Sequence, residues 1–218
     1  MINWSFSALK SFKNCPRRYN EVSRLKRVKE APFDATSKGL VVHKHLEDAV
    51  TLGTPVPAPF THYQSIIDTL VAIPGEKAAE RQFTFTAEMT PVSWFSKDAW
   101  LRYAADLLIT NDDKALAHLI DYKSGKSKYA DTEQLKLGAL CVFYTYPHID
   151  RVKGALVFTS ESKMIPATYT RDNIARYWEP FMGTYNQIMR CVEVDQWTPK
   201  PSGLCASCPV TSCENHKG

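Results

Sequence analysis

The sequence lacks the features of membrane, fibrous and disordered proteins. Its 218 residues contain no apolar run near the roughly 20 residues that span a bilayer, no internal repeat and no low-complexity tract. The first residues carry no charged segment followed by an apolar stretch, so we expect no secretory signal and a cytoplasmic location. Hydrophobic residues make up 44% and charged residues 23%, which suits a single domain with a buried core.

Acidic residues are scarce near the start of the chain, and the net charge of +4 is therefore unevenly distributed. Between positions 10 and 29 there is one acid, Glu21, among eight basic residues. Such a stretch can contact phosphates and release counterions, although a solvated helical face is the other interpretation. The basic residues are Lys10, Lys13, Arg17, Arg18, Arg24, Lys26, Arg27 and Lys29.

Three of the six cysteines, Cys205, Cys208 and Cys213, form the pattern C-x2-C-x4-C. Without a secretory signal, disulfides are not the default use of such thiols. Closely spaced thiolates are typical of a zinc site or an iron–sulfur cluster, and a metal would supply folding energy to this Pro- and Ser-rich tail.

A tetrahedral site needs a fourth ligand from elsewhere in the chain. Cys15 is the better choice, because it precedes a proline that should end the first helix, and His216 is the other. The remaining cysteines, Cys141 and Cys191, lie in apolar helical patterns and are interpreted as core residues.

Hydrophobic periodicity predicts an α/β domain with a central mixed sheet flanked by helices. After a first helix capped by Ser5 or Ser7, helices are expected at 39–50, 63–73, 132–146 and 171–192. Strands are expected at 81–86, 100–110, 115–123, 152–160 and 164–169. We expect one domain, made of a helical part at 1–75, a core at 76–192 and a cysteine-rich tail at 193–218.

The second and third predicted strands should form a hairpin that carries two acids and a lysine. Asp121 and Lys123 are two residues apart and share a strand face. A turn centred between residues 112 and 113 would pair Asp106 with Leu119 and make Asp121 its diagonal neighbour. Paired carboxylates favour a hard divalent cation, beside which a lysine can orient water or stabilise charge on a phosphate. Ordinary salt bridges at the strand ends are the alternative.

Together these features resemble the RecB-like branch of the PD-(D/E)XK nuclease superfamily, which includes AddB-type and CRISPR-adaptation nucleases with a four-cysteine cluster. Ser5-Phe6-Ser7-Ala8-Leu9, followed by Cys15-Pro16-Arg17-Arg18-Tyr19, is similar to the start of that family. Gly39 and His43 resemble its G-x-x-x-H motif. Ala105-Asp106 and Asp121-Tyr122-Lys123 resemble the two motifs that give the superfamily its name.

The resemblance implies a restriction-endonuclease-like core and a set of site residues. It implies Mg²⁺ or Mn²⁺ bound by His43, Asp106, Asp121 and the carbonyl of Tyr122, with Lys123 catalytic. It also implies a [4Fe–4S] cluster on Cys15, Cys205, Cys208 and Cys213, with zinc as the alternative, which clasps the tail to the first helix.

Further residues have weaker parallels in the family. Glu80 resembles an acidic position of some members, and Glu47 could orient His43 or pair with Lys44 or Lys10. Gln134 begins what looks like the Q-x-x-x-Y helix that approaches DNA, and Arg17 and Arg18 would guide the phosphate backbone. Gly138 stands where that helix carries tyrosine, so Tyr144 or Tyr129 would supply the aromatic contact.

The implied activity is hydrolysis of phosphodiester bonds in DNA, by an exonuclease that acts on single strands or ends in recombination, repair or degradation. Small members of the family occur in phages and CRISPR loci, so the location would be the host cytoplasm if the protein is viral. A helicase, recombinase or integrase is an expected partner, and a membrane is not. The alternatives are a nucleic-acid-binding module without activity and a partner-dependent adaptation nuclease.

Overall fold

The computed structural model describes residues 2–30 and 34–217, the side chains of residues 34–38 and 40 excepted. The chain divides into two compact units. One is Asp34–Tyr177, and the other combines Met1–Phe33 with Trp178–Gly218. None of the described helices is long and apolar enough to cross a membrane.

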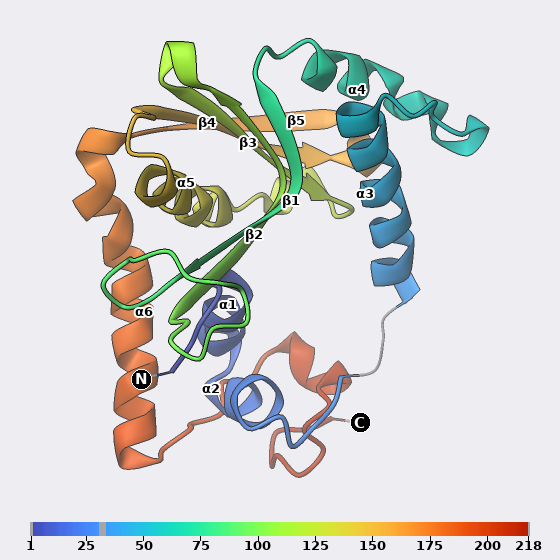
Figure 1. Ribbon diagram of the computed structural model, residues 1–218. Helices are drawn as coiled ribbons and strands as arrows, with labels where there is room; N and C mark the ends of the chain where they lie inside the picture. Colours follow the sequence, from blue (N-terminus) through green and yellow to red (C-terminus); the bar gives the residue numbers. More distant parts are fainter. Residues whose placement is uncertain (1, 31–33, 218) are drawn as a thin grey trace. The chain divides into compact units, whose positions relative to one another are not determined.

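A five-stranded mixed sheet forms the centre of the unit Asp34–Tyr177 (Figure 1). The strands follow the order β1-β2-β3-β4-β5, and only β3 and β4 run parallel. A parallel pair needs a crossover, and the helix α5 (Glu133–Thr145) provides it. The predicted α/β class is confirmed. The strands are β1 (Glu76–Phe85), β2 (Leu101–Asn111), β3 (Leu116–Lys123), β4 (Arg151–Phe158) and β5 (Lys163–Thr170).

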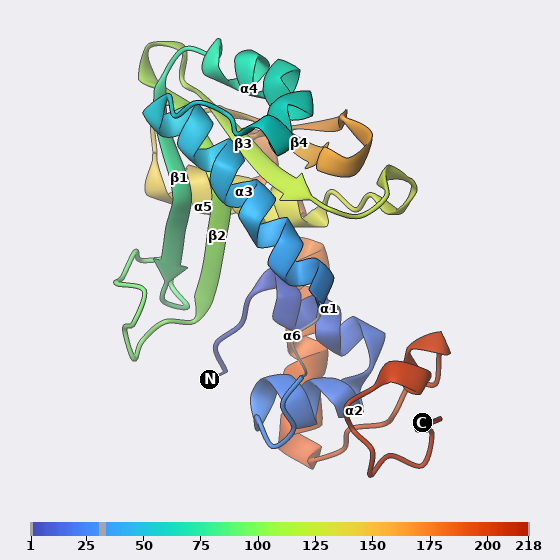
Figure 2. The same cartoon turned by 90° about the vertical axis from the view of Figure 1, so that its right-hand side faces the viewer.

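Helices cover both faces of the sheet (Figures 1 and 2). On one face, α3 (Asp34–Leu52) and α4 (Gln64–Val71) share an apolar cluster with the sheet, in which Leu46 and Ile66 join Leu107 and Ile120. On the other face, α5 packs against β2, β3 and β4. The helix α5 is apolar on almost all sides, as expected for a buried crossover helix.

The hairpin between β2 and β3 differs in register from the predicted one. Leu108 pairs with Leu119, so Asp106 lies opposite Asp121 when the register is continued, and the expected pairing of Asp106 with Leu119 is wrong by two residues. The turn starts later than expected because Asn111 accepts a hydrogen bond from Lys114 N and caps the short helix η3 (Asp112–Lys114). Ala115 follows in the left-handed conformation. A shift of two leaves every side chain on its predicted face.

Short helices complete the connections in this unit. A 3₁₀-helix, η2 (Ala58–Tyr63), occupies the proline-rich segment before α4. The others are η4 (Ser127–Tyr129), η5 (Thr159–Glu161) and η6 (Arg171–Asn173).

The second unit brings the two ends of the chain together. Its first helix, α1 (Phe6–Asn14), begins after Ser5, whose side chain accepts a hydrogen bond from Ala8 N, and ends before Cys15 as Pro16 predicts. Then come α2 (Pro16–Arg18), the π-helix η1 (Tyr19–Arg24), the long helix α6 (Ile174–Val194) and η7 (Gly203–Ser207). Aromatic contacts link these segments, since Trp4 packs on Phe181 and Tyr19 on Trp197.

Candidate active site

The strands β2 and β3 separate at Asp106, and its carboxylate occupies the point of separation. The ladder between the strands ends at the pair Leu107 and Ile120. Just beyond it, Asp106 Oδ2 accepts a 2.6 Å hydrogen bond from the backbone N–H of Tyr122. A side chain thus replaces the next ladder bond, which holds Asp106 close to the start of the Asp121-Tyr122-Lys123 segment.

Asp106 also lies at an irregularity of β2, where the alternation of side chains between the two faces of the sheet is broken. Tyr103 and Leu107 would share a face in a regular strand. Leu107 belongs to the apolar cluster of α3 and α4, whereas Tyr103 lies against Gly138 of α5. A carboxylate at such a crossing point can meet groups from both helix layers.

The neighbouring strand has its own irregularity at the same level. Glu80 lies directly opposite Asp106, between the ladder pairs Ala79–Leu107 and Arg81–Ala105. Its φ of +46° is in the left-handed region, which is strained for a residue with a side chain. Strained residues of this kind cluster at functional sites.

Asp121, Lys123 and Gln134 form a closed hydrogen-bonded group. Lys123 Nζ lies 2.6 Å from Asp121 Oδ2 and 2.8 Å from Gln134 Oε1. Gln134 Nε2 donates to Asp121 Oδ1 at 2.6 Å. The Asp121 side chain is only 3% exposed, and a buried charge of this kind needs such partners. Gln134, at the start of α5, therefore holds both members of the acid–lysine pair.

Electrostatics at the two aspartates favour a bound cation. Burial, and next the charge of Asp121, raise the pKa of Asp106 from 3.8 to about 7, against the opposing hydrogen bond from Tyr122. Two carboxylates that face one another in a site of low dielectric repel, and a divalent cation removes that repulsion.

His43 of α3 reaches the same place from the other helix layer. Its Nδ1 lies 3.9 Å from Asp106 Oδ2, and its ring lies 5.5 Å from that of Tyr122. Burial, and next the charge of Lys123, lower the pKa of His43, so the imidazole is held in the neutral form that can ligate a metal.

Glu47 and Glu80 lie at the margin of this site. Glu47 pairs with Lys44, at 3.6 Å, and the described residues include no hydrogen bond from it to His43. Burial, and next the charge of Glu47, raise the pKa of Glu80. Glu80 and Glu47 thus extend the negative potential outward from Asp106.

The predicted DNA contacts differ in how their side chains are engaged. Arg18 donates to Ser11 Oγ and pairs with Glu30. Arg17 has no ion pair or hydrogen-bond partner among the described residues, and its Nε is buried. Both aromatic candidates are exposed, and Tyr144 also packs edge-on against Phe85.

The four predicted cluster cysteines line one cavity of about 230 Å³ in the unit that holds both chain ends. Backbone N–H groups reach two of the sulfurs, with Lys200 N 3.4 Å from Cys15 Sγ and Ser202 N 3.4 Å from Cys205 Sγ. His216, the other proposed ligand, lines the same cavity. Of the two remaining cysteines, Cys141 is fully buried and Cys191 half-buried.

Neither predicted metal site has a complete coordination sphere. Within residues 2–30 and 34–217, no three His, Cys, Asp or Glu side chains are placed to hold one ion. At the acidic site, both aspartates are engaged by protein donors instead: Asp106 by Tyr122, and Asp121 by Lys123 and Gln134.

The structure gives two side chains surroundings that the sequence does not indicate. The Tyr103 phenol is buried beneath Asp121, whose charge, after burial, raises its pKa. No polar pattern in the sequence indicates this, because Tyr103 is one apolar position of a strand. Arg24 lies in the basic stretch, but only the fold shows that it stacks on Trp197, with its Cζ 5.2 Å from the ring centre.

One family model and two solved structures are similar to the chain. No curated protein matches the chain. A "putative exonuclease" of Eubacterium rectale has a similar structure, with a TM-score of 0.54 and 13% identity, over 94% of this chain and 86% of that one. The structure of SSO0001 aligns with a TM-score of 0.47 and 12% identity, over 99% of this chain and 88% of that one. The family model for the PD-(D/E)XK nuclease superfamily matches residues 3–213. The chain therefore belongs to the PD-(D/E)XK nuclease superfamily.

Proposed function

We propose that this protein is a metal-dependent deoxyribonuclease that hydrolyses phosphodiester bonds. The observation that supports this most is the meeting of Asp106 and Asp121 with Lys123, whose ammonium group lies 2.6 Å from Asp121 Oδ2. The two carboxylates are of the type that binds a divalent cation, and such a cation and the ammonium group would both stabilise the negative charge that develops on a phosphate in hydrolysis.

The proposed metal is Mg²⁺ or Mn²⁺, because the donor atoms at this site are of the type that these hard cations prefer. Asp106 and Asp121 supply the carboxylate oxygens that hard cations prefer, and His43 and the carbonyl of Tyr122 are the further donors. When bound, the metal acts as a Lewis acid and lowers the pKa of a coordinated water. A bound cation would offset both the burial of Asp106 and its repulsion from Asp121, which together raise the pKa of Asp106.

The side chains around the metal donors have separate tasks in this proposal. Lys123 orients the attacking water or stabilises charge on the phosphate oxygens. Gln134 contacts the Lys123 ammonium group at 2.8 Å and the Asp121 carboxylate at 2.6 Å, and it thereby positions the two side chains relative to one another. His43 stays neutral, because burial lowers its pKa, and can give its lone pair to the metal.

The proposed substrate is DNA, attacked from ends or as single strands. The basic stretch that contains Arg17 and Arg18 supports a nucleic-acid substrate. The name of the Eubacterium rectale protein supports an exonuclease. A cytoplasmic location and a helicase, recombinase or integrase as partner complete the proposal, whether the source is a phage or a cell.

The test uses end-labelled single- and double-stranded DNA and a closed circular DNA with Mn²⁺ or Mg²⁺. We expect cleavage of the linear substrates, and a loss of at least about a hundredfold in Asp121→Ala and in Lys123→Ala. Asp113→Ala, an exposed acid on the same hairpin, is the matched control and should cleave normally.

Three results would overturn parts of the proposal. Activity that persists in both Asp121→Ala and Lys123→Ala would remove the catalytic assignment. DNA binding without cleavage would indicate an inactive binding module. Cleavage only after addition of an integrase would indicate an adaptation nuclease.

The proposal includes a [4Fe–4S] cluster on Cys15, Cys205, Cys208 and Cys213. What supports it is that all four cysteines, from opposite ends of the chain, line one cavity of about 230 Å³. Four thiolates that surround a space suit a multi-atom cluster better than a single zinc ion. Its role would be structural, as a clasp within this unit.

Anaerobically purified protein should be brown and contain iron, and Cys205→Ala should be colourless. Cys191→Ala is the control, because Cys191 lies outside the cavity. Colourless wild-type protein that contains stoichiometric zinc would show that the site binds zinc and not iron. Wild-type protein free of both metals would refute the proposed metal clasp.

A further inference from the structure

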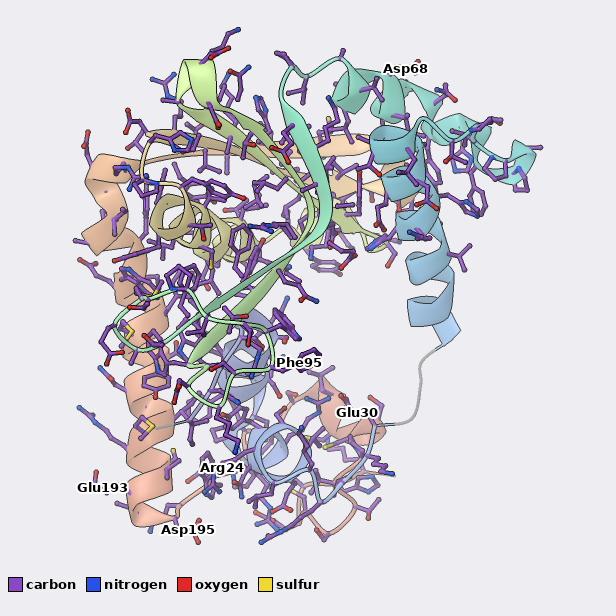
Figure 3. The ribbon with its side chains drawn as sticks, in the orientation of Figure 1. Arg24, Glu30, Asp68, Phe95, Glu193 and Asp195 are labelled. Carbon is purple, nitrogen blue, oxygen red and sulfur yellow. The ribbon has the colours of Figure 1, made fainter. Side chains whose placement is uncertain are left out.

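A second cavity, of about 530 Å³, lies in the unit formed by the chain ends, and Arg17 lines both this cavity and the one lined by Cys205, Cys208 and Cys213. Three arginines line it, Arg17, Arg24 and Arg27, together with Asn20 and Trp197. Figure 3 labels Arg24 and Asp195, two residues of its wall. Its volume is in the range of cavities that accept a nucleotide-sized ligand.

Arg24 is held in place before any ligand binds. Its guanidinium lies over the Trp197 ring, with Cζ 5.2 Å from the ring centre, and Nη1 donates to Asn20 Oδ1 at 2.9 Å. Trp197 is itself held, because its Nε1 donates to Asp195 Oδ1 at 3.0 Å. A guanidinium has five N–H groups, so most of those of Arg24 are free of protein acceptors among the described residues.

The positive charge in this cavity exceeds the acids that could neutralise it. Arg17 has no counter-ion among the described residues, and its Nε is buried. The Arg27 side chain is 66% exposed, and its Nη1 lies 3.9 Å from Glu21 Oε1, so this ion pair is weak. Asp195, the other acid in the wall, accepts a hydrogen bond from Trp197 and keeps its negative charge, so three arginines face two acids. Arg24 is half-buried and has no ion pair among the described residues, which favours an external anion beside it.

We infer that this cavity binds backbone phosphates of a single nucleic-acid strand. Guanidinium groups match phosphate oxygens with paired hydrogen bonds, which makes arginine the preferred residue for this contact. A strand fits better than a free nucleotide, because the exposed Lys26 and Lys29 continue the positive charge beyond the cavity. The inference rests on the proposed function, for which it supplies a site that holds the substrate.

The test measures binding of a labelled oligothymidylate of about 12 nucleotides by fluorescence anisotropy, in EDTA and over a series of salt concentrations. Removing one arginine–phosphate pair should reduce the slope of log Kd against log salt by about 0.7. We therefore expect reduced slopes and weaker binding in Arg24→Gln and in Arg27→Gln. Arg190→Gln, which removes an exposed charge from α6 outside the cavity, is the matched control.

Competition distinguishes the two sources of phosphate. Unlabelled oligothymidylate should displace the labelled strand, whereas thymidine monophosphate and inorganic phosphate at equal phosphate concentration should not. Equal displacement by thymidine monophosphate would overturn the strand assignment in favour of a nucleotide site.

The variants distinguish a failure of this inference from misfolding and from a failure of the proposed function. Arg27→Gln changes a side chain that is 66% exposed, so its weaker binding cannot come from misfolding. Arg24→Lys keeps the charge but not the paired donors, and should bind between the wild type and Arg24→Gln. Binding that is the same in all variants would overturn the inference even if the protein cleaves DNA. Arginine-dependent binding without cleavage would instead refute only the nuclease proposal.

Discussion

The backbone of Gly138 lies so close to Tyr103 that a methyl group on Gly138 would be 2.6 Å from the Tyr103 Oη. The same methyl group would lie 2.4 Å from Leu119 Cδ2. The ring of Tyr103, from β2, fills the space next to Gly138. The absence of a side chain at Gly138 is therefore a packing requirement.

Gly138→Ala should lower the free energy of unfolding by about 1–3 kcal/mol, because the added methyl group overpacks a buried contact. Urea denaturation monitored by circular dichroism measures the change. The control is Gly183→Ala in α6, where nothing lies within 4 Å and alanine should stabilise the helix by up to about 1 kcal/mol. Equal effects at the two glycines would contradict the packing argument.

Tyr103→Phe should raise the free energy of unfolding by about 1 kcal/mol. The Tyr103 Oη is buried and has no hydrogen-bond partner among the described residues, so its removal relieves a desolvated polar group. Tyr169→Phe is the matched control, because Tyr169 Oη donates to Thr132 O at 3.0 Å and its loss should destabilise. Denaturant midpoints of the two variants should move in opposite directions; a shift of both toward lower urea would refute the prediction.

Glu80→Gly should stabilise the protein and reduce its nuclease activity. Glycine adopts a φ of +46° without a Cβ clash, which is worth about 1 kcal/mol, and the repulsion from Glu47 disappears. Activity should fall if the Glu80 carboxylate contributes to the negative potential around Asp106. Glu76→Gly, at the start of the same strand, should lower stability and leave activity intact. A stabilised Glu80→Gly with full activity would assign Glu80 no part in the reaction.

Metal-free protein should lose stability as the pH rises from about 4 to 7. The pKa of Asp106 is raised from 3.8 to about 7 in the folded state, chiefly by burial, so over this interval the folded state binds more protons than the unfolded state. Stability then falls with increasing pH, and it is greatest on the acidic side of that interval. Asp106→Asn should flatten the dependence, measured as the thermal midpoint in EDTA. A wild-type midpoint that rises over the same interval would contradict the burial of Asp106.

Much of the fold follows from local sequence signals. The apolar periodicity of β2 to β5, the cap at Ser5 and the proline after Cys15 each predict the element or boundary that the structure contains. The hairpin register does not follow, because it depends on Asn111 capping η3 and on Ala115 adopting a left-handed conformation. Neither residue type demands that geometry.

The candidate site is only partly predictable for a similar reason. A spacing of two predicts that Asp121 and Lys123 share a face, and they form an ion pair. The separation of β2 from β3, which brings Asp106 Oδ2 to the Tyr122 N–H, depends on tertiary contacts with both helix layers. The strain at Glu80 and the stacking of Arg24 on Trp197 likewise have no local signature.

The division of the chain has a consequence for the order in which it folds during synthesis. The unit Asp34–Tyr177 is continuous, so all its strands are synthesised before Cys205, Cys208 and Cys213 of the other unit. The other unit needs residues from both ends of the chain, and its four-cysteine cavity cannot exist until Cys213 has been translated. Assembly of that cavity, and of any cluster held there, would therefore follow the synthesis of the whole unit Asp34–Tyr177.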